Sequence, residues 1–420
     1  MNIPCHQDMI IRIGSGKLYK PEALFFVSYI IFLTLMMLRT TMLSVTIGET
    51  AYKLVSLGGL CLLLVKEYID QKQPMPVLIY LLFLALFFII IKKNASFLTS
   101  ASLFYIYSGR NIDFKKIAKV TICVELIVLL VIISSSLAGL IENYHFDTLT
   151  DRPREFLGFL YALYPQAYVA NIAGLWFYVN KEKVSILSLF LLELFSYWIF
   201  SRTNSRLCFL LTTFLLISAL FYKAVYYIKR DRIKSIVKVI VALGFVFSFV
   251  TCYIGSLWIH IKYDSAVSWM SRINSLLGNR FYYGNMSYIQ YGISAFGKHI
   301  QWLGNGLDPT GKVLTGQYLY VDNLYLQVSQ KYGLLLTMLA LVAITVTLYV
   351  CWKQKDYVLL FIFGTVALHA LIDDLVLHLW YNTFWFVVGQ AIFVNVWRTH
   401  KKRVQKRENE ICQMTSESFN

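Results

Sequence analysis

The sequence predicts an all-α integral membrane protein with about twelve transmembrane helices and a large extracytoplasmic loop before the last three. Hydrophobic residues make up 58% of the 420 residues, charged residues only 15%, and the mean hydropathy is +0.59. Soluble domains carry roughly 25% charged residues. Apolar runs of about 20 residues, enough to cross a bilayer, follow one another along the chain. The Lys and Arg residues behind the net charge of +16 lie mostly in the short stretches between these runs.

Twelve apolar runs are candidates for membrane spans. They cover residues 23–43, 46–65, 75–92, 95–108, 118–140, 158–179, 184–200, 207–227, 236–257, 332–351, 357–377 and 379–397. They divide the chain into an N-terminal bundle of about nine helices (1–257), a loop with short interfacial helices (258–331), C-terminal transmembrane helices (332–397) and a basic cytoplasmic tail (398–420). The segment 1–22 lacks the apolar core of a signal peptide, so we expect the first run to stay in the membrane.

The orientation follows from the positive-inside rule, which places Lys-rich and Arg-rich short loops in the cytoplasm. With both termini in the cytoplasm, most of the basic residues fall inside. The outer side then presents the loop 141–157, the short connection 201–206 and the segment 258–333. The segment 258–333 is too long for a structureless connector, and loops of such length are usually functional.

Several function classes find no support in the sequence. The basic residues follow the loops of a membrane topology and form no nucleic-acid-binding face. The seven cysteines are scattered singly, with no spacing suited to zinc or to a disulfide framework, so we expect packing roles and no metal. The chain has no Gly-rich phosphate loop ending in Lys-Ser/Thr and no His-Glu-x-x-His motif, which gives ATP-driven transport and metalloprotease chemistry no basis.

Arginines gather on the predicted outer side, against the bias of the positive-inside rule. They fall into three groups, Arg152 with Arg154, Arg202 with Arg206, and Arg272 with Arg280. A guanidinium grips phosphate oxygens with two parallel hydrogen bonds, which Lys does not. If a helix continues through residues 201–206, Arg202 and Arg206 share one face. We interpret Arg152, Arg154, Arg202 and Arg206 as a diphosphate-binding group; pairing with nearby acids or lipid headgroups is the plainer alternative.

The large loop holds the candidates for proton transfer. Asp322, in the stretch Tyr320-Val-Asp-Asn-Leu-Tyr325, can deprotonate a hydroxyl group, or it can fix an arginine or cap a helix. We take Asp322 and Arg280 as the catalytic candidates, and His260 and His299 as weaker candidates for a base. The loop is also rich in Trp, Tyr and Phe, which either stack on sugars or belong to a membrane-interface belt.

Short motifs in the outer segments carry a resemblance to a known family. They are Arg154-Glu-Phe-Leu-Gly-Phe159, Ser201-Arg202-Thr203, Asn274-Ser-Leu-Leu-Gly-Asn-Arg280, Leu303-Gly-Asn-Gly306, Val321-Asp-Asn-Leu-Tyr325 and Lys331-Tyr-Gly333. Over about residues 150–335 the chain resembles the bacterial polysaccharide polymerases of the Wzy type, relatives of the O-antigen ligases. The ligase relatives carry a loop His as the proposed base, and this chain has no clear equivalent.

The resemblance implies a membrane-embedded glycosyltransferase of the bacterial plasma membrane that makes capsule, exopolysaccharide or O-antigen. Its substrate is a glycan linked to undecaprenyl diphosphate, and its outer arginines hold the diphosphate. The implied transfer is inverting and needs no metal and no cofactor. The implied partners are membrane lipid and the flippase and chain-length regulator of the same pathway, without nucleic acid.

Two alternatives stay open. A flippase or other transporter of lipid-linked oligosaccharides is favoured by acids in apolar runs, namely Glu125, Glu193, Asp373 and Asp374. Hydrogen bonding between helices by a protonated Glu is the plainer explanation of Glu125 and Glu193. A ligase that transfers the glycan to another acceptor is the second alternative.

Overall fold

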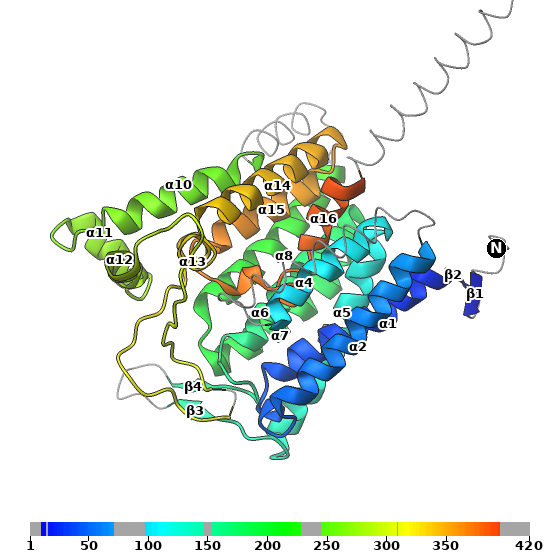
Figure 1. The fold of residues 1–420 in the computed structure, drawn as a ribbon, viewed down its shortest axis with the longest axis horizontal. Coiled ribbons are helices and arrows are strands. Elements are labelled where there is room, and N and C mark those ends of the chain that lie inside the picture. Colours follow the sequence, from blue (N-terminus) through cyan, green and yellow to red (C-terminus); the bar gives the residue numbers. More distant parts are fainter. Residues whose placement is uncertain are drawn as a thin grey trace, which may run out of the picture.

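The computed structural model describes residues 10–13, 16–70, 97–146, 153–227, 245–308 and 310–394. This part of the chain is mostly helical, and its long helices pack side by side (Figure 1). The helical fold class is therefore confirmed. The predicted run 75–92, the start of the run 236–257 and the tail 398–420 lie outside the described residues, so the count of twelve spans stays a prediction.

Within the part of the chain that the structure describes, five helices are long and apolar enough to cross a membrane. They are α1 (Lys20–Arg39), α5 (Phe114–Leu137), α7 (Ile186–Thr203), α8 (Arg206–Tyr227) and α14 (Leu334–Lys353). Between 22% and 50% of the residues in their most apolar stretches are buried inside the protein. In water such an exposed apolar surface is unfavourable, whereas lipid tails cover it without cost.

The other elements are shorter or less apolar. The helices are α2 (Glu49–Asp70), α4 (Phe97–Ser108), α6 (Tyr164–Asn180), α10 (Ser248–Ile261), α11 (Ser268–Leu276), α12 (Arg280–Tyr291), α13 (Leu324–Lys331), α15 (Tyr357–His369) and α16 (Trp385–Gly389). Single turns form η2 (Met42–Val45), η3 (Gly109–Asn111), η4 (Lys181–Lys183), η5 (Leu375–Leu377) and the π-helical η6 (Gln390–Val394). Two antiparallel strand pairs are β1 (Ile10–Ile13) with β2 (Gly16–Tyr19), and β3 (His145–Phe146) with β4 (Arg154–Glu155).

Helix α6 lies at the centre of the bundle and packs against α5, α7 and α8. Most of its residues from Pro165 to Phe177 are buried. Pro165 in the first turn lacks the amide hydrogen that a helix start leaves unpaired in any case. Near its middle, Gly174 leaves room for the ring of Phe384. A helix buried on nearly all sides is the natural anchor for the polar groups of its neighbours.

Polar side chains link the helices inside the bundle. Asn171 of α6 donates a hydrogen bond of 2.8 Å to Oε1 of Glu125 in α5 and one of 2.9 Å to Oγ1 of Thr383. Thr213 of α8 donates a hydrogen bond of 2.6 Å to Oε1 of Glu193 in α7. Glu125 and Glu193 thus accept hydrogen bonds between helices, as the plainer explanation expects.

Replacing Asn171 with alanine should destabilise the bundle. Glu125 would lose its hydrogen-bond donor, and the amide and hydroxyl of Thr383 would lose their partner. An unsatisfied buried polar group costs about 1–3 kcal/mol, so we expect the free energy of unfolding in detergent micelles to fall by about 2–3 kcal/mol. The matched control is Ser218→Ala, which removes an exposed hydroxyl of α8. Equal stabilities of the two variants would contradict this role of Asn171.

The predicted helices 357–377 and 379–397 are wrong in their bounds. Helix α15 ends at His369, and residues 370–384 form an irregular segment that contains η5. Polar side chains replace the missing helical hydrogen bonds: Asn323 donates to the carbonyl oxygen of Leu371 (2.8 Å), and Asp373 accepts from the amide of Leu375 (2.9 Å). Within a membrane, non-helical backbone requires hydrogen-bond partners from the protein itself. The hydropathy of the sequence does not predict this break.

The predicted outer segment 258–333 contains α11, α12 and α13. Figure 1 shows α10, α11 and α12 extending from one end of the molecule, and the irregular chain after α12 running toward β3 and β4. The amide of Leu307 in this chain donates a hydrogen bond of 2.9 Å to the carbonyl oxygen of Leu160, just after β4. The fold therefore brings residues 153–163, α12 and the start of α13 into one region.

Candidate functional site

Arg280 and Asp322, both singled out from the sequence, form an ion pair. Nε of Arg280 lies 3.0 Å from Oδ2 of Asp322. The side chains are 22% and 24% exposed, so both are largely withdrawn from water but still reachable. A partly buried pair is screened less by salt than an exposed one. Chemically, the pair places a fixed positive charge beside a carboxylate.

A tight turn positions Arg280 at the first residue of α12. The residue before it, Asn279, has φ 64°, in the left-handed region that asparagine tolerates better than most residues. Asn274 closes the turn: its side chain donates to Oδ1 of Asn279 (3.0 Å), and its carbonyl oxygen accepts from the amide of Asn279 (2.8 Å). Nη1 of Arg280 donates to the carbonyl oxygen of Leu277 (2.9 Å). The stretch 274–280 therefore holds the guanidinium in place.

Asn323, the residue after Asp322, makes several hydrogen bonds that fix the position of Asp322. Asn323 caps α13 by accepting a hydrogen bond of 2.9 Å from the amide of Leu326. Ser256 of α10 donates to the same Asn323 oxygen (2.7 Å). Of the two structural roles considered for Asp322, capping thus belongs to Asn323, and Asp322 pairs with an arginine.

The surroundings raise the pKa of Asp322 from 3.8 to about 6. Burial is the largest cause, because it disfavours the charged form. The positive charge of Arg280 acts in the opposite direction, the negative charge of Asp373 raises the pKa further, and Arg154 lowers it. Asp322 is therefore mostly ionised at neutral pH and can still take up a proton readily. That is what a general base requires.

Two tyrosines, Tyr161 and Tyr318, are near enough to the pair to feel its charges, and they were missed as site residues. The rings of Tyr283 and Tyr318 pack edge to face with centroids 4.7 Å apart. Burial, and next the charge of Asp322, raise the pKa of Tyr318. The charges of Asp322, Arg154 and Arg280 also act on Tyr161. We call Arg154, Tyr161, Arg280, Tyr318 and Asp322 the Arg280–Asp322 cluster. The sequence signal was the density of tyrosines in the loop, which a membrane-interface belt explains equally well.

Among the described residues, Arg154 is the member of the proposed diphosphate-binding group whose charge acts on Asp322. It lies in β4 opposite Phe146 of β3 and is half-buried. Its charge reaches Asp322 and Tyr161. Arg152 lies outside the described residues.

Arg202 and Arg206 do not share one helix, so the expectation of two guanidinium groups on one helical face is wrong. Helix α7 ends at Thr203 because Asn204 adopts the left-handed conformation (φ 52°), and α8 begins at Arg206. Nη1 of Arg202 lies 3.1 Å from Oε1 of Glu155, and Arg202 is 45% exposed. Arg206, also exposed, donates to Oδ1 of Asn204 (3.3 Å). Within the part of the chain described, neither contacts the Arg280–Asp322 pair.

The two loop histidines differ in their surroundings. His260 is buried, its Nδ1 lies 2.7 Å from the carbonyl oxygen of Ser256, and its ring packs where Gly284 of α12 has no side chain. Burial lowers the pKa of His260. His299 is exposed, with its Nε2 3.4 Å from Nε2 of Gln301. The packing of His260 indicates a structural role.

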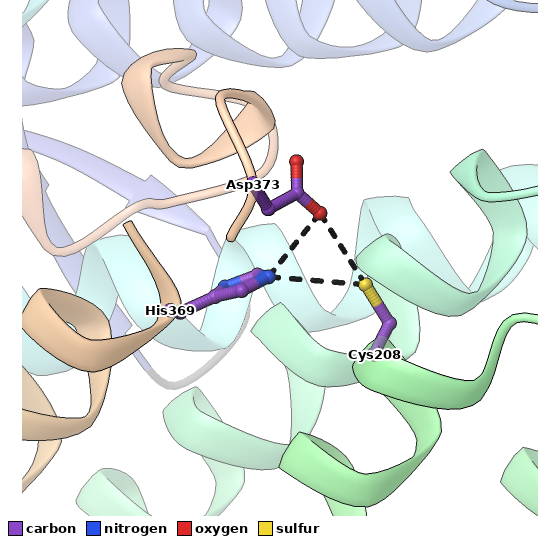
Figure 2. Close-up of side chains that lie close together, drawn as sticks. All are labelled: Cys208, His369 and Asp373. Carbon is purple, nitrogen blue, oxygen red and sulfur yellow. Dashed lines mark hydrogen bonds and ion pairs between the residues drawn. The ribbon is translucent and has the colours of Figure 1, made fainter. Parts of the chain in front are cut away.

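Sequence reasoning also missed a group of three side chains from two parts of the bundle. Figure 2 shows Cys208 of α8, His369 at the end of α15 and Asp373 of the irregular segment pointing toward one another. Cys208 and His369 are far apart in the sequence, so no spacing rule links them. The only local signal was the His369-x-x-x-Asp373 spacing, which is too common to be specific.

Compared with known protein families, with curated proteins and with solved structures, the chain matches none of them. The function of the chain is therefore inferred from the geometry of its own residues.

Proposed function

We propose that the protein polymerises oligosaccharide repeat units linked to undecaprenyl diphosphate, on the outer face of the bacterial plasma membrane. The observation that carries the proposal is the Arg280–Asp322 pair, a fixed guanidinium beside a carboxylate whose pKa is raised to about 6. Both groups lie in the large segment that the charge pattern assigns to the outside. Arg154 and the tyrosines add a second positive charge and flat rings suited to a sugar.

In the proposed reaction, the arginines stabilise the leaving group. The bond between the anomeric carbon of the growing glycan and the diphosphate oxygen breaks, and the lipid diphosphate leaves with the bonding electrons. Arg280 and Arg154 stabilise this charge electrostatically. When the diphosphate takes up the guanidinium of Arg280, the ion pair with Asp322 loosens and the carboxylate is released for chemistry.

Asp322 acts on the acceptor. A hydroxyl oxygen of the terminal sugar of the second lipid-linked unit attacks the anomeric carbon and forms the new glycosidic bond. The carboxylate of Asp322 takes the hydroxyl proton. One direct displacement inverts the anomeric centre. The energy of the reaction resides in the glycosyl diphosphate, so neither ATP nor an ion gradient is consumed.

We also propose a membrane topology with about twelve spans, both termini in the cytoplasm and residues 258–333 outside. We expect Thr315→Cys, exposed in this segment, to react on intact cells with a maleimide that does not cross membranes. Gln354→Cys, exposed between α14 and α15 beside Lys353 and Lys355, should react only after the cells are opened. Labelling is counted above that of the unsubstituted protein. The reverse pattern would invert the topology and remove the site from the outer face.

Polymerisation should depend on pH through Asp322. Because the base must be ionised, the rate should rise with pH and level off above a midpoint of about 6. The charges facing the carboxylate are Arg280, Asp373 and Arg154, of which the arginines stay positive throughout. The folded pKa exceeds the 3.8 of an ordinary aspartate, so ionised Asp322 lowers folding stability as pH rises from about 4 to 6. The pH range that tests this is about one unit on either side of the midpoint, roughly pH 5 to 7. A rate that does not change over this range would exclude Asp322 as the base.

A flippase of the same lipid-linked substrate is the second candidate. The observation that favours it is the polar chain of Glu125, Asn171 and Thr383 inside the bundle. A flippase moves its substrate across a sealed bilayer and leaves its length unchanged. A purified polymerase, by contrast, lengthens lipid-linked repeats in detergent, where no gradient exists.

A further inference from the structure

We propose that Cys208, His369 and Asp373 form a binding site for a divalent cation of the zinc type. The thiol sulfur, the imidazole Nε2 and the carboxylate Oδ2 lie within 4.8 Å of one another. The proposal departs from the expectation from the sequence, where the scattered cysteines indicated no metal. It does not depend on the proposed function.

The separations of the three atoms match the edges of a tetrahedral zinc site. Nε2 of His369 lies 3.2 Å from Oδ2 of Asp373 and 3.8 Å from Sγ of Cys208, and Sγ lies 3.6 Å from Oδ2. Zinc bonds of about 2.0–2.1 Å to nitrogen, about 2.0–2.2 Å to oxygen and about 2.3 Å to sulfur give tetrahedral edges of roughly 3.4–3.6 Å. A cation can therefore bind after shifts of only a few tenths of an ångström.

A hydrogen bond to the backbone orients the carboxylate of Asp373. The other carboxylate oxygen of Asp373, Oδ1, accepts a hydrogen bond of 2.9 Å from the amide of Leu375, which leaves Oδ2 for the cation. Such contacts orient ligands in metal sites. Cys208 is fully buried in the first turn of α8, and His369 is the last residue of α15. Three separate elements thus contribute one ligand atom each.

Charge and ligand type favour a divalent cation over a hydrogen-bonded triad. In the triad, Oδ2 of Asp373 must accept from both His369 and Cys208, and the sulfur and Nε2 still face each other. A thiolate and a carboxylate together balance a charge of two, so the bound site is neutral inside an apolar bundle. A sulfur, nitrogen and oxygen set suits zinc better than magnesium or calcium, which prefer oxygen alone.

A small cavity borders one of the three proposed ligands, His369. His369 lines a cavity of about 40 Å³ together with Thr365, Asn171 and Asn382. A cavity above about 15 Å³ can hold a water molecule when polar groups line it. Three protein ligands and one water complete a tetrahedral shell.

The ion would tie α8 to the irregular segment 370–384, whose Asp373 also acts electrostatically on Asp322. Its role is to position this segment.

The test uses the full-length protein in detergent, with its affinity tag removed. After exposure to Zn²⁺ and removal of loosely bound metal, elemental analysis should find about one zinc per chain. Cys208→Ser and Asp373→Asn should each bind at least roughly tenfold less. The controls are Cys252→Ser, which alters a half-buried cysteine in α10, and Asp308→Asn in an exposed loop. Both should retain the wild-type zinc content.

Cobalt provides a readout that does not depend on the variants folding. Co²⁺ bound by the wild-type protein should show the near-ultraviolet absorption of a thiolate–cobalt bond, and added Zn²⁺ should abolish it. A variant that elutes as aggregate in size-exclusion chromatography is set aside. The cobalt spectrum of the wild-type protein then decides whether a thiolate binds the metal. Wild-type protein without zinc and without the cobalt absorption would overturn the proposal, as would a folded Cys208→Ser protein with full zinc content.

Discussion

Asp322→Asn is expected to lower the rate of polymerisation by roughly 10²- to 10⁴-fold, the usual contribution of a general base. The amide keeps the size of the carboxylate but cannot take a proton. Because the leaving-group arginines remain, lipid-linked substrate should still bind, and the loss should appear in kcat rather than in KM. Chain elongation by purified protein, resolved on gels, measures the rate. Binding of the lipid-linked unit is measured separately.

The matched control for this substitution is Asp308→Asn. Asp308 lies in the same segment, 258–333, and its carboxylate accepts hydrogen bonds from the amides of Thr310 and Lys312 within an exposed turn. We expect it to elongate chains at the wild-type rate. A normal rate for Asp322→Asn would remove Asp322 from the role of the base, although it would leave the polymerase reaction standing.

Arg280→Lys is expected to be nearly as damaging as Arg280→Ala, with a loss of roughly a hundredfold in rate for each. Lysine keeps the positive charge but loses the planar fork that binds two phosphate oxygens. One lost contact of this kind in a water-poor site costs about 3 kcal/mol. Cells that carry either variant should accumulate single repeat units and make little polymer. Arg280→Ala should also weaken substrate binding.

Arg272 provides the control, since it is an exposed arginine on the neighbouring helix α11. Arg272→Lys should leave chain length unchanged. If Arg280→Lys made chains of wild-type length while Arg280→Ala did not, a simple positive charge would suffice. That result would exclude the two-pronged contact with a diphosphate. Wild-type chains from both variants would remove Arg280 from the site.

The length of the apolar runs predicted the helices that cross the bundle as single units, such as α5 and α14. They did not predict the break after His369, where Asn323 and Asp373 supply hydrogen bonds to the irregular backbone. Hydropathy averages over such partners, which come from elsewhere in the chain. The broken segment was therefore assigned to two continuous helices.

The candidate site, too, was predicted only in part from the sequence. Arg280 was singled out because arginines on the predicted outer side oppose the positive-inside rule, and Asp322 because it is an acid near them in the sequence. The sequence did not show that the two side chains contact each other. The shared face of Arg202 and Arg206 was wrong because one residue, Asn204, ends the helix between them. From the sequence, Cys208 was assigned a packing role, and Asp373 was weighed separately as evidence for a transporter. Only the fold brings their side chains together.

The central claim is that this membrane protein makes glycosidic bonds, and chain elongation in detergent tests it most directly. Purified protein, without a membrane potential or ion gradient, is supplied with lipid-linked repeat units from its own host cell. The account predicts a ladder of longer lipid-linked glycans with wild-type protein, and a ladder reduced at least roughly a hundredfold with Asp322→Asn. Wild-type protein that leaves the repeat units at their original length, yet moves them across a sealed bilayer, would contradict the account and identify a flippase.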